Sequence, residues 1–293
     1  MTKSKTQASA AAGVAPSSVP VFILAGGKGT RLSEETHSKP KPMIEVGDVP
    51  ILLHIMRSYY AYGFNDFVIL AGYRAWDIKQ FFLNYEFRMN HLAIDHRSVQ
   101  DSAPTIVGRS MAQEKWRVRV IDTGEDTMTG GRVARAFDQI EGSEGFENFA
   151  VTYGDGVCDV HLKDELDYHL AHGNIGTVLG VPPLARFGEL DIKAGDRVDG
   201  FREKPAPMKG QSSGLINGGF FFFKREFRKY LSTDESCILE RDPVSKLASD
   251  GGLQVFRHFG FWHPMDVLRD KNYLSELWSA GKAPWAVQRK SVV

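Results

Sequence analysis

Short apolar runs alternate with amphipathic segments along the chain, from Val19 almost to its end. The pattern of a buried strand is seen at residues 19–24 (VPVFIL), that of a helix at 50–63 (PILLHIMRSYYAYG), and that of a second strand at 66–72 (DFVILAG). A strand, a helix and a strand in this order form a βαβ unit, in which the two strands lie parallel in one sheet. The chain is therefore predicted to adopt an α/β fold with a mostly parallel sheet flanked by helices.

The same alternation indicates how the 293 residues are organised. Residues 1–18 are rich in Ala and Ser and are expected to be a disordered tail. We expect one α/β domain at 19–233 and a small strand and helix extension at 234–293 that packs on it. Further strands are predicted at 116–122, 149–155, 176–181 and 214–223, and further helices at 76–87, 131–140, 163–172, 242–249 and 265–278.

Charge and cysteine content argue against several classes of protein. Lys plus Arg and Asp plus Glu both number 36, so no net charge attracts nucleic acid or an anionic membrane. Cys158 and Cys237 show no CxxC or His-linked metal spacing, which fits a reducing cytoplasm. No apolar stretch approaches the roughly 20 residues of a membrane span. We expect a cytoplasmic protein without nucleic-acid or membrane partners, in which any phosphate binding is local.

A glycine-rich loop, AGGKGTRL (25–32), directly follows the first predicted strand, where ligands bind in open α/β sheets. Gly26, Gly27 and Gly29 allow the backbone to approach a ligand and to aim N–H groups at it. A tight turn that needs glycines is the alternative, but Thr30 and Arg31 favour phosphate binding. The loop is not GxxxxGK[ST], and AGYR stands where an NAD-binding protein would carry an acidic residue after the second strand, so kinase and NAD oxidoreductase functions are disfavoured.

A second cationic segment follows in SKPKPM (38–43). Lys39 and Lys41 alternate with two prolines, which hold the backbone extended. Restrained lysines beside a glycine loop suit a triphosphate, although two solvated surface lysines would give the same pattern.

These two segments together resemble a known family. LAGGKGTRLSEETHSKPKPMIEVGDVPIL (24–52) is similar to the signature of the sugar nucleotidylyltransferases, in the glucose-1-phosphate cytidylyltransferase branch. The likeness continues through DTGEDTMTGGR, TYGDGV, FREKP, NGGFFFF and GFWHPMD. It implies a Rossmann-like nucleotidyltransferase fold, Mg²⁺ as cofactor, and transfer of CMP from CTP to a hexose 1-phosphate, with glucose 1-phosphate favoured, to give a CDP-hexose and pyrophosphate. It also implies a homo-oligomer, often a hexamer, that serves bacterial surface polysaccharide synthesis. The N-terminal tail and Lys28, where related enzymes often carry Leu, depart from the family pattern.

The resemblance assigns roles to individual residues of the nucleotide side. Thr127 and Arg132 would contact cytosine; the alternative is a helix N-terminus with Thr129 as cap and Arg132 solvated. Catalytic charge neutralisation falls to Arg31, Lys41 and Lys204. The complete nucleotide-binding set is Leu24, Ala25, Gly26, Gly27, Gly29, Thr30, Arg31, Lys41, Thr127, Arg132 and Gly154.

Metal and sugar ligands are implied in the same way. Asp155 follows the strand FAVTYGD and Asp266 lies in FWHPMD; both offer the hard oxygen that Mg²⁺ prefers, although a turn-forming Asp is the alternative for Asp155. The sugar phosphate would be bound by Gly188, Glu203, Lys204 and Asn217.

The expected chemistry needs no general base, because the attacking phosphate oxygen is already anionic at neutral pH. Positioning and charge neutralisation remain as the tasks of the protein. UTP or dTTP in place of CTP, or a non-catalytic sugar-nucleotide sensor, are the alternatives. His169 and His172 are expected on a solvated helix face, and residues 220–223 as a buried core strand.

Overall fold

A seven-stranded sheet forms the centre of the computed structural model, which describes residues 14–37, 39–97, 103–108, 114–141, 145–184, 189–192, 198–202 and 214–286. The strand order is β14-β10-β13-β8-β1-β4-β7. Neighbouring strands are parallel except that β13 runs antiparallel to both β8 and β10. The strands of this sheet are β1 (Val21–Ala25), β4 (Asp66–Ala71), β7 (Arg117–Asp122), β8 (Asn148–Tyr153), β10 (Gly176–Val181), β13 (Ile216–Lys224) and β14 (Leu253–Arg257).

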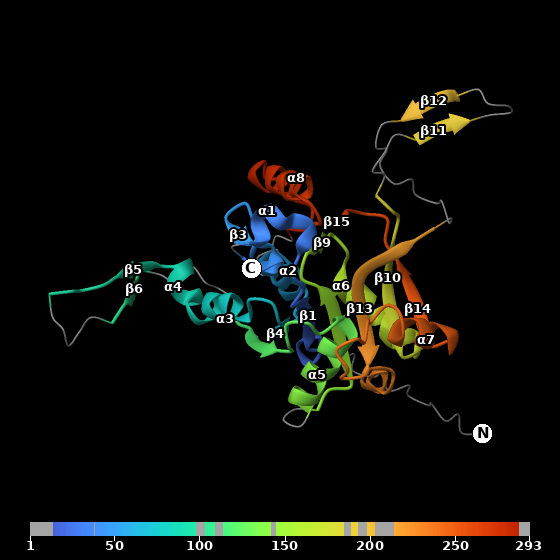
Figure 1. Ribbon diagram of the computed structural model, residues 1–293, viewed down its shortest axis with the longest axis horizontal. Helices are drawn as coiled ribbons and strands as arrows, with labels where there is room; N and C mark the ends of the chain where they lie inside the picture. Colours follow the sequence, from blue (N-terminus) through green and yellow to red (C-terminus); the bar gives the residue numbers. More distant parts are fainter. Residues whose placement is uncertain are drawn as a thin grey trace, which may run out of the picture.

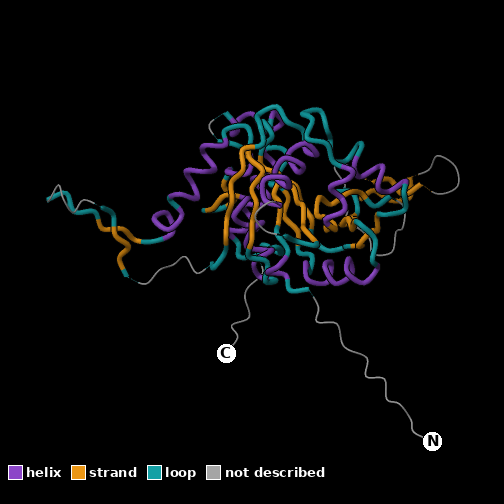
Figure 2. The backbone as a smooth tube through the Cα atoms, turned by 90° about the horizontal axis from the view of Figure 1, so that it is seen from below, coloured by secondary structure: helices purple, strands orange, loops and turns teal. Residues whose placement is uncertain are grey.

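Helices cover both faces of this sheet (Figures 1 and 2). Alternate residues of β1 face opposite sides, so that Val21 and Ile23 pack in one core with α2, α3 and α6, while Phe22 packs in the other with α5 and α7. The helices are α1 (Ser33–Thr36), α2 (Ile51–Ala61), α3 (Ala75–Leu83), α4 (Tyr85–Met89), α5 (Thr129–Glu141), α6 (Leu162–His172), α7 (Pro243–Ser249) and α8 (Leu268–Ser279). The prediction of an α/β fold with a mostly parallel sheet is confirmed.

The described residues also form four two-stranded pairings: β2 (Glu45–Val46) with β3 (Val49–Pro50), β5 (His91–Ala93) with β6 (Thr105–Val107), β9 (Gly156–Cys158) with β15 (Trp262–Pro264), and β11 (Glu189–Ile192) with β12 (Val198–Arg202). The β5–β6 hairpin lies at the end of an arm that leaves the sheet through α3 and α4 (Figure 1). The segment after 234 supplies β14, which pairs with β10 at one edge of the main sheet. No helix in the described ranges has both the length and the apolar character to cross a membrane.

Two sequence predictions about side chains meet different outcomes. The core strand at 220–223 is confirmed, since its four Phe side chains are buried. The solvated helix face is wrong for His169, which is fully buried with Nδ1 2.9 Å from Thr177 Oγ1. His172 Nε2 lies 2.7 Å from the same hydroxyl oxygen. The reason is that this face of α6 packs on β10 and β13, and burial lowers the pKa of His169 to about 3, so that its ring is neutral.

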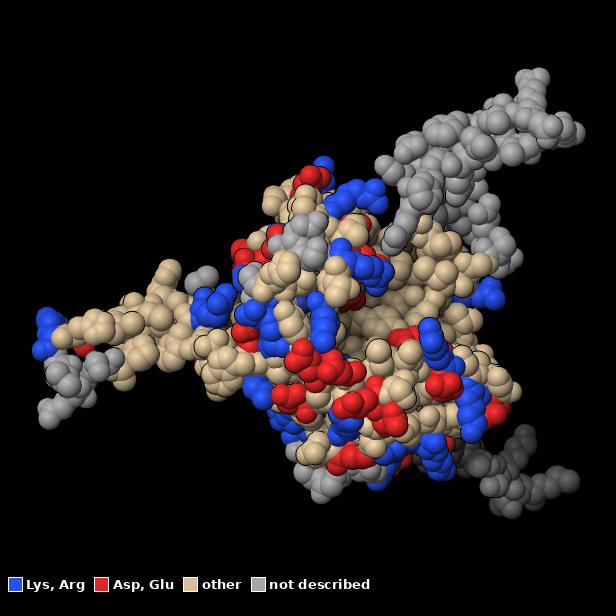
Figure 3. Space-filling view, viewed as in Figure 1, with Lys and Arg blue, Asp and Glu red and all other residues tan. Residues whose placement is uncertain are grey.

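The surface carries both signs of charge. Figure 3 shows basic and acidic side chains interspersed over the face in view, in keeping with the equal numbers of 36 cationic and 36 anionic residues.

Candidate active site

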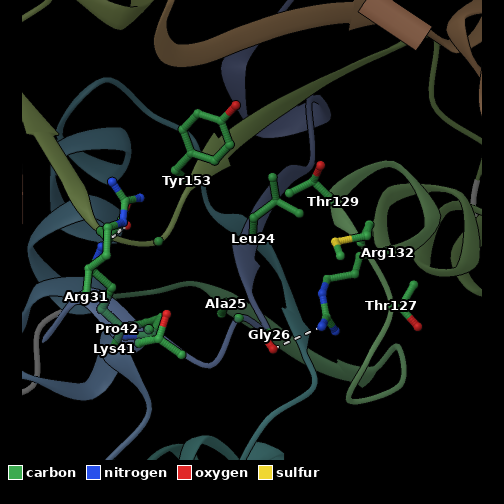
Figure 4. A pocket seen from close by; sticks show the side chains of 16 residues that line it. Leu24, Ala25, Gly26, Arg31, Lys41, Pro42, Thr127, Thr129, Arg132 and Tyr153 are labelled. Atoms are coloured by element: carbon green, nitrogen blue, oxygen red, sulfur yellow. Dashed lines mark hydrogen bonds and ion pairs between the residues drawn. The ribbon is translucent and has the colours of Figure 1, made fainter. Parts of the chain in front are cut away.

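A pocket of about 360 Å³ lies at the carboxyl ends of β1 and β8 (Figure 4). Every residue that the sequence predicts on the nucleotide side lines it, as does Asp155, which the sequence predicts as a metal ligand. The structure adds four residues that the sequence does not assign to the site, namely Pro42, Met128, Thr129 and Tyr153. The lining residues are Leu24, Ala25, Gly26, Gly27, Gly29, Thr30, Arg31, Lys41, Pro42, Thr127, Met128, Thr129, Arg132, Tyr153, Gly154 and Asp155.

The glycine loop owes its path to two glycines that no other residue could replace without movement. Gly29 has φ +62°, a left-handed conformation that side chains disfavour. A Cβ on Gly26 would lie 2.2 Å from an Arg132 guanidinium nitrogen. The loop therefore closes tightly over Arg132 and leaves its other side open to the pocket.

Lys41 lies between the two carboxylates predicted to bind metal. It follows Pro40 in a 3-10 helix (Lys41–Met43) and its side chain is only 10% exposed. Lys41 Nζ donates to Asp155 Oδ2 at 2.6 Å and to Asp266 Oδ1 at 3.0 Å. Arg31 Nη1 reaches the other oxygen of Asp266 at 3.3 Å. Two cations and two anions thus meet at the pocket, where Arg31, Lys41 and Asp155 are lining residues.

The pairing of β9 with β15 brings the two aspartates together across the chain. Asp155 immediately precedes β9, and Asp266 follows β15 with one residue, Met265, between them. The ladder ends with Gly156 opposite Pro264, and Met265 N then donates to Asp155 O at 2.8 Å. This short ladder therefore fixes the separation of the two carboxylates.

These carboxylates fit a divalent cation. Both converge on one position, now held by the Lys41 ammonium, and carboxylate oxygens are the ligands that Mg²⁺ prefers. Asp155 and Asp266 are the residues that would hold such an ion.

Arg132 lines the pocket, so its contact with cytosine stays a prediction, while its hydrogen bonds show a structural role that the sequence did not indicate. Its side chain is buried, with 4% of the residue exposed, which excludes the solvated alternative. The guanidinium spans from the glycine loop to the segment before α5 (Figure 4). It donates to one hydroxyl and four main-chain carbonyl oxygens: Thr123 Oγ1 (2.8 Å), Gly26 O (2.9 Å), Ala71 O (3.2 Å), Gly124 O (2.6 Å) and Glu125 O (2.9 Å). Arg132 thus ties two pocket loops together from beneath.

Replacing Arg132 with Ala should lower the free energy of unfolding by about 3 kcal/mol, because several buried carbonyl groups lose their donor. CTP affinity should fall together with stability, since both loops lose their tie. Thermal unfolding and CTP titration of the same variant measure the two effects. A variant of unchanged stability with weakened CTP binding would instead support the direct contact with cytosine.

The segment opposite the glycine loop is held by charged and polar contacts. Thr127, 3% exposed, accepts from Arg135 Nη1 at 2.7 Å. At the surface, Lys28 Nζ pairs with Asp126 at 2.8 Å and with Glu125 at 3.5 Å, so it links the same two loops as Arg132. The predicted alternative of Thr129 as a helix cap is not seen: its hydroxyl donates to Glu240 Oε2 at 3.0 Å and accepts from Leu239 N.

The sugar side is described in part. Asn217 Nδ2 donates to Tyr153 Oη at 3.3 Å, and Asn217 Oδ1 accepts from Gly219 N at 2.8 Å. Gly188, Glu203 and Lys204, which the sequence predicts here, lie outside the described residues. Tyr153 is absent from the sequence prediction, although its place immediately before Gly154 and Asp155 could have indicated it.

One group outside the pocket also gathers potential metal ligands. Ligating atoms of Cys158, Asp159 and His258 lie within 4.8 Å of one another, which the sequence spacing does not reveal. Asp159 Oδ1 already accepts from Phe261 N at 2.7 Å and lies 2.8 Å from His258 Nε2. Burial raises the pKa of the Cys158 thiol, so these contacts are explained as local structure.

The site combines the glycine loop, the start of α5 and the cations Arg31 and Lys41 at the carboxyl edge of a mostly parallel sheet. This arrangement is that of a nucleotide-binding α/β protein. The chain belongs to the nucleotidyl transferase family, whose model matches residues 20–250. Asp266 lies beyond that matched region.

Full-length relatives extend the comparison. The chain is 45% identical over 267 residues to the glucose-1-phosphate cytidylyltransferase of Salmonella typhimurium, covering 90% of this chain and 97% of that one. It is 39% identical over 265 residues to the probable glucose-1-phosphate cytidylyltransferase of Bacillus subtilis, covering 90% and 98%. The crystal structure of HddC from Yersinia pseudotuberculosis, 22% identical, superposes with a TM-score of 0.59 over 89% of this chain and 99% of that one, a likeness of fold. The predicted family and nucleotidyltransferase class are confirmed, and enzymes of this family generally use a divalent metal.

Proposed function

We propose that the protein transfers CMP from CTP to α-D-glucose 1-phosphate, giving CDP-glucose and pyrophosphate. The observation that carries the proposal is the Lys41 ammonium between Asp155 and Asp266, beside a glycine loop at the carboxyl end of β1. The cytidylyltransferases at 45% and 39% identity support the choice of CTP and glucose 1-phosphate.

This reaction requires the protein to position two anionic substrates and to neutralise their charge, and residues of the pocket can do both. A phosphate oxygen of the sugar 1-phosphate attacks the α-phosphorus of CTP, the bond to the bridging oxygen breaks, and pyrophosphate leaves in line. Lys41, which lines the pocket, neutralises anionic phosphate oxygen, and the glycine loop offers backbone N–H groups. The Arg31 side chain is 72% exposed and its ion pair with Asp266 is long at 3.3 Å, so exchange of that pair for the triphosphate costs little.

Finer assignments extend the proposal by resemblance. Mg²⁺ held by Asp155 and Asp266 would supply additional neutralisation of phosphate charge when bound. We assign binding of the sugar phosphate to Gly188, Glu203, Lys204 and Asn217. Lys204 is also assigned a share in neutralising the charge of the reacting phosphates. We further propose that the enzyme is cytoplasmic and homo-oligomeric, a hexamer by resemblance, and that its product serves lipopolysaccharide O-antigen synthesis.

The substrate assignment is tested with the purified protein, Mg²⁺, each of the four NTPs and dTTP, and a panel of sugar 1-phosphates. Pyrophosphate release gives kcat/KM for each pair. We expect CTP with glucose 1-phosphate to exceed every other pair by about tenfold or more, since a base-specific pocket leaves polar groups unpaired with the wrong base. Preference for UTP or dTTP would contradict CTP specificity, and tight binding of CDP-glucose without turnover with any pair would favour a sensor.

A further inference from the structure

Glu240 lies outside the lining of the pocket, in the segment between β13 and α7, yet both of its carboxylate oxygens accept hydrogen bonds from lining side chains. Tyr153 Oη donates to Oε1, and Thr129 Oγ1 donates to Oε2 at 3.0 Å. Thr129 begins α5 and Tyr153 ends β8, so the two donors come from different elements. One carboxylate thus joins two walls of the pocket.

The contact with Thr129 belongs to a tight junction with the start of α5. Leu239 N donates to Thr129 Oγ1 at 2.9 Å, and Gly130 N donates to Cys237 O at 2.9 Å. A Cβ on Gly130 would lie 2.6 Å from Cys237 Sγ, which leaves no room between the two segments. The position of Glu240 is therefore coupled to the segment that carries Thr127 and Arg132.

The contact with Tyr153 reaches the other half of the pocket. The Tyr153 ring lies where a Cβ on Gly219 would come within 2.2 Å, and its hydroxyl accepts from Asn217 Nδ2. Two residues further along the chain stands Asp155. A shift of Tyr153 would thus move both Asn217, the predicted sugar ligand, and Asp155, one of the two carboxylates that contact Lys41.

We propose that Glu240 is a positioning residue that fixes two walls of the pocket relative to each other. The nucleotide wall is the segment with Thr127, Thr129 and Arg132, and the sugar wall is formed by Tyr153 and Asn217. Thr129 lies on the side of the pocket that carries Thr127 and Arg132, away from Arg31 and Lys41 (Figure 4). This inference rests on the proposed function, which assigns a different substrate to each wall.

Four variants separate the two contacts. Thr129→Val removes the nucleotide-side donor and should raise the KM for CTP with little effect on glucose 1-phosphate. Tyr153→Phe removes the sugar-side donor and should do the reverse. Glu240→Ala removes both bonds to a charged acceptor and should raise both KM values roughly tenfold, with Glu240→Gln intermediate because its amide oxygen keeps one acceptor.

Glu114 provides the matched control. Its carboxylate accepts from Arg57 Nε at 2.8 Å and from Tyr85 Oη at 3.0 Å, the same kind of contacts, and it does not line the pocket. Glu114→Ala should lower Tm and leave both KM values unchanged. The proposal is overturned if Glu240→Ala lowers Tm in the same way while both KM values stay within about twofold of wild type, or if only one of them rises.

Failure of the proposed function gives a different result, namely no CDP-glucose from the wild-type protein. In that case calorimetric titration with CTP alone and with glucose 1-phosphate alone applies the same test to the same variants. Loss of both affinities in Glu240→Ala supports the positioning role, and unchanged affinities overturn it.

Discussion

Asp155→Asn and Asp266→Asn should each lower kcat by about a hundredfold or more, because each replaces a charged hard ligand with a neutral amide of the same size. Initial rates over a Mg²⁺ titration measure the effect, and we expect the Mg²⁺ concentration for half-maximal rate to rise in both variants. Asp266→Asn should lower kcat more than Asp155→Asn does, since Asp266 contacts Arg31 as well as Lys41.

Asp138→Asn is the control for this pair. Asp138 binds Arg228 Nε at 2.7 Å, so the variant also breaks an ion pair, but it does so away from the pocket lining. Its turnover and Mg²⁺ dependence should match wild type. Near-normal turnover and Mg²⁺ dependence in both site variants would refute the metal assignment.

Glu165→Gln should make the stability of the protein much less sensitive to a rise in pH from about 5 to 8. Glu165 is fully buried on α6, and neither carboxylate oxygen has a hydrogen-bond partner among the described residues. Burial raises the pKa of this carboxyl from 4.5 to about 8. Between these two values the unfolded chain is ionised and the folded protein is not, so the wild type loses stability as pH rises and Gln does not.

The size of this effect follows from linkage. Each pH unit in that window changes the unfolding equilibrium by up to about tenfold, which gives roughly several hundredfold between pH 5 and 8. Urea unfolding of wild type and Glu165→Gln at several pH values gives the difference curve. Buried histidines such as His54 and His169 contribute equally to both proteins and cancel. The exposed Glu226→Gln should follow the wild type, and a flat difference curve for Glu165→Gln would show that the buried carboxyl is ionised at neutral pH.

The nucleotide side of the site could be predicted from the sequence because its parts are local. Gly26, Gly29 and Asp155 each follow an apolar strand within a few residues, and parallel strands bring their carboxyl ends to one edge. Only the resemblance to a family joined Asp266 to this edge, since nothing in its own segment shows that β15 pairs with β9.

Contacts that depend on packing could not be predicted in this way. Arg132 stands in a motif, but the motif does not show that main-chain carbonyl groups occupy its guanidinium. Glu240 lies in no motif and meets Tyr153 only because the segment before α7 folds back on α5. His169 is polar and sits on an amphipathic helix, and only the position of α6 on the sheet shows that it is buried.

Asp266 lies near the C-terminal end of the chain, which affects when the active site can form during synthesis. During synthesis Lys41 and Asp155 leave the ribosome well before Asp266, so a nascent chain can form β1, β4 and β8 while Lys41 still lacks its second carboxylate. On the proposed mechanism, turnover begins only after β15 has docked on β9. A premature stop just before β15 would retain the residues of every strand of the main sheet but lack Asp266, so on this mechanism the chain would be inert.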